Sequence, residues 1–137
     1  MPAMLQTVPV SQKTRWVGRI MSGLPALFLL VDGVMKLFQP PIVVETTVQL
    51  GYPASVIPAL GIVLLVSTAL YVIPRTSILG AILLTGYLGG AVATHVRVGN
   101  PLFSHTIFPV YVAAFVWGGL FFRDPRVRAL IPLRRAE

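Results

Sequence analysis

The sequence predicts an all-α integral membrane protein, a four-helix bundle with both termini in the cytoplasm. Hydrophobic residues make up 55% of its 137 residues, charged residues only 11%, and the mean hydropathy is +0.82. A soluble domain of this size needs a more polar exterior. The apolar residues form four stretches, 16–38, 56–73, 77–98 and 106–122. Each has about the length that crosses a hydrocarbon core of roughly 30 Å, so we expect one membrane domain over residues 1–137.

The basic residues predict the orientation of the bundle. Only Lys36 and Arg97 fall on one side of the four stretches, whereas nine basic residues fall on the other: Lys13, Arg15, Arg19, Arg75, Arg123, Arg126, Arg128, Arg134 and Arg135. Loops rich in Lys and Arg stay in the cytoplasm, which places both termini there. The net charge of +7 is concentrated near the chain ends. The basic tail, residues 123–135, therefore favours anionic lipid headgroups, and we expect no nucleic-acid partner.

The first stretch is expected to be a retained span. It is too long and starts too late for a signal peptide, and it lacks a small-residue cleavage site. Residues 1–14 before it are polar or mixed, and we expect them to be loosely ordered. Pro25 in the first stretch and Pro109 in the fourth each remove a helical hydrogen bond, which predicts a kink at each position.

The links between the spans carry turn and cap signals. The longest, residues 39–55, is expected to cap the outer surface, with Pro41 opening a short helix and Gly51 closing it. The segment "IPRTS" (73–77) predicts a tight cytoplasmic turn, so the second and third spans form an antiparallel hairpin. In the second outer link, Ser104 is a candidate N-cap of the fourth span.

The ionisable residues of the spans gather in the outer half of the membrane. Asp32 lies 12 residues beyond Ile20, or about 18 Å deep, and Lys36 is one turn further on the same helix face. His95 and Arg97 end the third span, and His105 opens the fourth. Glu45 in the outer link is a further candidate for this cluster.

Helical spacing predicts which way these side chains point. Arg97 continues the row of Gly86, Gly90 and Thr94, whose small-xxx-small spacing is typical of closely packed membrane helices. We therefore expect Arg97 to pair with Asp32 across a packed interface, with Lys36 as a second partner of the carboxylate.

His95 instead lies on the same helix face as Tyr87 and Ala91, because the three residues are spaced four positions apart. We expect His95 to line a neighbouring wall of the polar cluster together with Tyr87. The candidate ligand-binding residues are thus Asp32, Lys36, Tyr87, His95, Arg97 and His105.

Two interpretations of this polar cluster stay open. It is either a structural ion pair that fixes helix register or a polar pocket for a ligand headgroup or a proton, the functional role that intramembrane charges usually have. The chain has no cysteine, and its two histidines flank a short loop, so we expect neither a thiolate centre nor a haem, and no metal site. Catalytic residues are unknown, because no acid–base pair stands out beyond Asp32 and His95.

Three segments resemble the DoxX-like family of small bacterial four-span membrane proteins. They are "DGVMKLFQP" (32–40), "GYLGGAVATHVRVGNPLFSH" (86–105) and "WGGLFFRDPRVRALIP" (117–132). The resemblance implies a four-helix bundle in the bacterial inner membrane. The family takes its name from a subunit associated with a terminal quinol oxidase and thiosulfate oxidation in an archaeon, and some relatives look like membrane partners of redox-stress enzymes.

The preferred functional hypothesis is a binding or accessory subunit associated with membrane redox metabolism. Its outer-half pocket would hold a quinone-like or other amphipathic molecule, with donors from Arg97, Lys36, Tyr87 or His95, and would serve a redox-enzyme partner. A quinone is the one cofactor that this hypothesis names. One alternative is a proton-coupled small-solute transporter using Asp32 and His95, which would need a homo-oligomer. A structural membrane protein and a catalytic isomerase or reductase are the others.

Overall fold

The computed structural model describes residues 9–134, and all of its regular structure there is helical. The helices are α1 (Gln12–Phe38), α2 (Pro41–Gln49), α3 (Ile57–Val72), α4 (Ser77–Val98), α5 (Phe108–Arg123) and α6 (Pro125–Leu130). Two 3-10 turns, η1 (Ala54–Val56) and η2 (Pro74–Thr76), precede α3 and α4, and a π-helical turn, η3 (Leu102–Thr106), precedes α5.

Four segments of the structure have the length and hydropathy to cross a membrane. They are Gln12–Phe38, Ala54–Val72, Pro74–Val98 and Leu102–Arg123, which confirms the four predicted spans. Large apolar side chains are exposed along all four, as Leu27, Ile62, Ile82 and Phe115 illustrate. An exposed apolar surface of this extent is suited to lipid rather than to water. The protein is therefore a multi-pass membrane protein.

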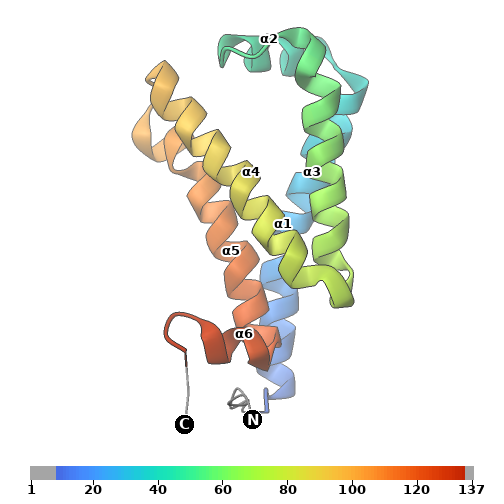
Figure 1. Cartoon of the computed structure of the whole chain (residues 1–137), viewed down its shortest axis with the longest axis vertical. Coiled ribbons are helices and arrows are strands. Elements are labelled where there is room, and N and C mark those ends of the chain that lie inside the picture. The colour runs from blue at the N-terminus through green and yellow to red at the C-terminus, as the bar shows by residue number, and fades with distance from the viewer. Residues whose placement is uncertain (1–8, 135–137) are drawn as a thin grey trace, which may run out of the picture.

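The four spans pack in a ring. Helix α1 packs against α3 and α5, and α4 completes the ring by packing against the same two helices. Figure 1 shows α4 and the start of α5 diverging from α1 and α3 toward the end of the bundle that carries α2. We call this the α2 end, and the opposite end, where α6 and the first turns of α1 lie, the α6 end. The first and last described helices thus share one end, as the predicted topology requires.

Small residues hold the bundle together near the α6 end. The buried face of α1 includes Gly18 and Ser22, which lie against Gly119 of α5. A Cβ atom on Gly18 would come within 2.7 Å of the Gly119 carbonyl oxygen, closer than real side chains approach. Small residues let two helix backbones approach in this way, which increases van der Waals contact where lipid offers no hydrophobic driving force.

The core lies between the ring of helices and contains one polar centre. Tyr71 of α3 is only 1% exposed, and it packs with apolar residues such as Leu84 and Val116. Its hydroxyl oxygen lies 2.7 Å from the Ser22 hydroxyl of α1 and 2.7 Å from the Val116 carbonyl oxygen of α5. One side chain thereby joins three of the four spans.

Several local predictions are confirmed, and three are wrong. Pro41 opens α2, Gly51 follows it with a left-handed φ of +95°, and η2 is the tight turn of the α3–α4 hairpin. Helix α1 already begins at Gln12, capped by Ser11, so residues 12–14 are helical rather than loose; residues 1–8 of that predicted segment lie outside the described part of the chain.

The other two errors concern the start of the fourth span. Pro109 lies in the first turn of α5, where a missing N–H costs no helical hydrogen bond, so the kink predicted there is wrong. Pro25 does lie inside α1. Ser104 lies within η3 and contacts the neighbouring His105 ring, and α5 begins later without a side-chain cap.

Candidate functional site

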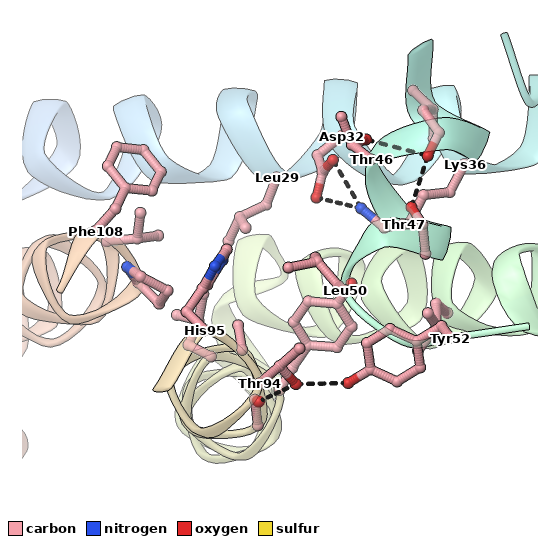
Figure 2. A pocket seen from close by; sticks show the side chains of 18 of the residues that line it. Leu29, Asp32, Lys36, Thr46, Thr47, Leu50, Tyr52, Thr94, His95 and Phe108 are labelled. Carbon is pink, nitrogen blue, oxygen red and sulfur yellow. Dashed lines mark hydrogen bonds and ion pairs between the residues drawn. The ribbon is translucent and has the colours of Figure 1, made fainter. Parts of the chain in front are cut away.

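The diverging helices line a cavity of about 440 Å³ at the α2 end. Helices α1, α2, α4 and α5 supply most of its lining, with α3 contributing Leu60. Figure 2 shows the Asp32–Lys36 pair of α1 facing Thr94 and His95 of α4 across this space. All four spans and α2 therefore contribute to the lining of the cavity.

An ion pair on α1 forms one side of the cavity. The Lys36 ammonium nitrogen lies 2.8 Å from each oxygen of the Asp32 carboxylate, one helical turn away. The Lys36 side chain is 13% exposed and that of Asp32 is 36% exposed, so both remain accessible from the cavity. This contact is the i, i+4 partnership that the sequence predicts for Lys36.

The predicted Arg97–Asp32 pair is wrong. The Arg97 guanidinium donates a hydrogen bond of 3.1 Å to the Leu50 carbonyl oxygen, and Arg97 does not belong to the cavity lining. Two causes act together: Lys36 already satisfies the carboxylate, and α4 diverges from α1 toward this end. Leu50 is the C-cap of α2, where carbonyl groups lack helical partners and accept such donors.

Gly51 makes this contact possible. Its positive φ favours glycine, and a Cβ atom there would come within 2.6 Å of an Arg97 guanidinium nitrogen. Arg97 therefore fastens the link after α2 to the last turn of α4.

Helix α4 supplies the polar wall opposite the ion pair. The Thr94 hydroxyl lies 2.7 Å from the Tyr52 hydroxyl and donates to the Gly90 carbonyl oxygen at 2.8 Å. The His95 Nδ1 atom lies 2.7 Å from the Asn100 side-chain nitrogen. Because an amide nitrogen can only donate, Nδ1 accepts and the neutral ring carries its proton on Nε2. Tyr87 and His95 both line the cavity, as their spacing predicts.

His105 lies outside this polar wall. Its ring centroid is 5.9 Å from that of His95, at an interplanar angle of 68°. His105 is exposed and does not belong to the cavity lining, whereas His95 is half-buried and does. Within residues 9–134, no three or more His, Asp or Glu side chains gather in the manner of a metal site.

The predicted close packing along Gly86 and Gly90 is also wrong. A Cβ atom on either glycine would meet no atom within 4 Å, and both residues line the cavity. The close approach on this helix is at Gly80, where a Cβ atom would collide with the Tyr71 backbone of the hairpin partner. The missing side chains of Gly86 and Gly90 leave space for the cavity instead of bringing two helices together.

Aromatic and aliphatic residues complete the cavity. Phe28 of α1 and Phe108 of α5 meet edge to face, with their ring centroids 5.5 Å apart. Leu60, Leu88 and Val112 extend this apolar side. The site therefore has a polar side, made of an ion pair, several hydroxyl groups and the His95 imidazole, and an apolar side that continues between the spans.

Sequence reasoning missed the contribution of the cap. Tyr52, Thr46 and Thr47 line the cavity because the chain from α2 to α3 folds back over it. The hydroxyl groups of Thr46 and Thr47 donate hydrogen bonds to carbonyl oxygens of their own helix, α2. Neither side chain therefore requires a hydrogen-bond partner on another helix. The clustering of Thr46, Thr47 and Tyr52 in an otherwise apolar link was the available signal.

Comparison with known proteins identifies one family. Residues 20–119, which reach from the first span into the fourth, match the model of the DoxX-like family. No curated protein and no solved structure matches the chain.

Proposed function

The chain belongs to the DoxX-like family, and we propose that it is a membrane-embedded binding or accessory protein whose cavity at the α2 end holds an amphipathic, quinone-like molecule. The observation that carries the proposal is the composition of the cavity. It joins a polar side with paired charges to an apolar side lined by Phe28, Phe108 and Val112. Its volume of about 440 Å³ lies within the range of about 300–1,000 Å³ that is common for small-molecule sites.

The polar side offers hydrogen-bond donors without a net charge. The Lys36 ammonium has three protons, of which the two Asp32 oxygens engage two. His95 presents its Nε2 proton, and the Tyr87 hydroxyl has no hydrogen-bond partner within residues 9–134. Three donors around a neutralised ion pair suit carbonyl or ether oxygens of an uncharged headgroup. A quinone ring has such carbonyl groups, and its apolar tail would lie along the phenylalanine side.

The position of the ion pair disfavours the purely structural interpretation. Asp32 and Lys36 belong to the same helix, so their contact does not hold two helices in register. Placing charged side chains in a membrane span costs free energy, and such residues usually have a functional role. Facing a cavity, the pair instead supplies a polar surface for a ligand.

The proposal includes an orientation and a setting. The nine basic residues on the side of the chain termini favour a cytoplasmic location for the α6 end, so that the cavity lies in the outer half of a bacterial inner membrane. There the protein would serve a redox enzyme by holding or presenting its lipid-soluble substrate.

Two glycines of α4 provide a matched test. Gly89 and Gly90 are both exposed, and a Cβ atom on either would meet nothing within 4 Å, but only Gly90 lines the cavity. Decylubiquinone is titrated into nanodiscs that carry the wild type, Gly90→Leu or Gly89→Leu. We expect saturable binding to the wild type and to Gly89→Leu. We expect binding to Gly90→Leu to be weaker by about tenfold or more, which corresponds to ~1.4 kcal/mol.

Two results would count against the proposal. Equal affinities of the two leucine variants would mean that the quinone binds elsewhere on the lipid-facing surface. Proton-linked solute flux in liposomes, together with the absence of saturable quinone binding, would contradict the binding-protein proposal and support the transporter alternative.

A further inference from the structure

A second, smaller cavity lies at the α6 end, away from the site described above. It has a volume of about 170 Å³ and lies between α1, α3 and α5. Arg19 and Ser22 of α1, Tyr71 of α3 and Arg123 of α5 line it. Its lining thus contains two guanidinium groups and no carboxylate.

Arg123 is held in place by the polar centre of the core. Its Nε atom donates to the Ser22 hydroxyl at 3.2 Å, and its Cζ atom lies 5.7 Å from the centroid of the Tyr71 ring. Ser22 is itself bonded to the Tyr71 hydroxyl. These contacts use one edge of the guanidinium group and leave its two terminal nitrogens without a hydrogen-bond partner among residues 9–134.

Arg19 is oriented by an aromatic ring instead. Its Cζ atom lies 5.3 Å from the centroid of the Trp16 ring on the same helix, and within residues 9–134 it forms no ion pair. Asp124, which directly follows Arg123 in the chain, is paired with Arg126. Two cations therefore share a small cavity without a carboxylate to balance them, an arrangement that an anion would stabilise.

From this geometry we propose that the cavity at the α6 end binds a negatively charged phosphate group, supplied by an anionic phospholipid headgroup or by free phosphate. The planar guanidinium group of arginine matches phosphate oxygens with paired donors. The Ser22 hydroxyl adds a neutral polar group at the same place. Phosphate groups of anionic lipids are concentrated at the cytoplasmic membrane surface, where basic residues attract them.

The test compares two arginines of the same end. Arg19 lines the cavity and contributes no hydrogen bond to the described fold, whereas the exposed Arg75 of η2 does not line it. Thermal unfolding of the wild type, Arg19→Gln and Arg75→Gln is followed in detergent during titration with dioctanoyl phosphatidylglycerol. Dioctanoyl phosphatidylcholine and inorganic phosphate, at matched ionic strength, form the other two arms.

We expect saturable stabilisation of the wild type and of Arg75→Gln, with an apparent affinity about tenfold weaker in Arg19→Gln, because a charge-assisted hydrogen bond is lost. A response to phosphatidylglycerol alone assigns the site to a lipid headgroup, and a response to inorganic phosphate assigns it to free phosphate. An equal loss of apparent affinity in the two variants would indicate non-specific electrostatic attraction by the basic α6 end. That result would overturn the proposed phosphate site. The same conclusion follows if neither phosphatidylglycerol nor phosphate stabilises the wild type.

Discussion

Replacing Tyr71 by phenylalanine removes a single hydroxyl group from the centre of the bundle. The ring stays, and with it both the packing of a side chain that is 1% exposed and the contact between the Arg123 guanidinium and the aromatic face. The change therefore isolates the two polar contacts of the hydroxyl, to Ser22 and to the Val116 carbonyl oxygen, each at 2.7 Å.

The expected cost follows from what is left behind. Ser22 keeps only the hydrogen bond from Arg123, and the Val116 carbonyl loses its side-chain donor in a buried position. Removing one partner of a buried hydrogen bond costs about 1–3 kcal/mol. The free energy of unfolding should fall by that amount, which lowers the folding equilibrium constant by roughly 5- to 150-fold.

The measurement is equilibrium unfolding in mixed micelles with increasing dodecyl sulfate. Tyr111→Phe is the matched control, because Tyr111 is 46% exposed on α5 and its hydroxyl has no partner within residues 9–134. We expect the control to change the free energy of unfolding by less than about 0.5 kcal/mol, as surface substitutions usually do. If the two variants lose the same stability, Tyr71 does not join the three spans and our account of the core is wrong.

Two other predictions concern the packing and the topology. Gly80→Ala should destabilise the protein by more than about 1 kcal/mol, because the added Cβ atom meets the Tyr71 backbone. The control Gly89→Ala should be neutral or slightly stabilising, because its Cβ atom meets nothing within 4 Å. Equal thermal stabilities of the two variants would refute the close approach at Gly80. Because the chain has no cysteine, Glu45→Cys in α2 and Arg126→Cys in α6 can be labelled singly in whole cells. An impermeant maleimide should label the first directly and the second only after permeabilisation, and the reverse pattern would invert the proposed orientation.

The four spans were predictable because bilayer thickness imposes a length and hydropathy that can be read locally. The same is true of the α2 boundaries, where Pro41 and Gly51 act through their own backbone preferences, and of the Asp32–Lys36 contact, which needs only one helical turn. Each of these features depends on residues close together in the chain.

The arrangement of α4 was not predictable in this way. Its glycines at positions 80, 86, 89 and 90 are chemically identical, and only the path of the neighbouring helices decides which of them meets another backbone. The partner of Arg97 depends on the divergence of α4 from α1 and on the return of the chain after α2. Tertiary packing of segments distant in the chain determined both the close-packed glycine and the partner of Arg97. The spacing of residues along α4 therefore predicted the wrong contacts.

The cap over the main cavity bears on how the proposed ligand would reach it. Helix α2 and Tyr52 cover the cavity at the α2 end, with the Tyr52 hydroxyl hydrogen-bonded to that of Thr94, whereas exposed residues of the spans, Gly86 and Gly90 among them, border it on the side. A ligand that enters between spans comes from the bilayer, so its effective concentration is its mole fraction in lipid rather than its amount per volume of water. Adding lipid at constant ligand and protein then dilutes the ligand and lowers occupancy. An affinity measured for the proposed ligand therefore has to be reported together with the lipid-to-ligand ratio.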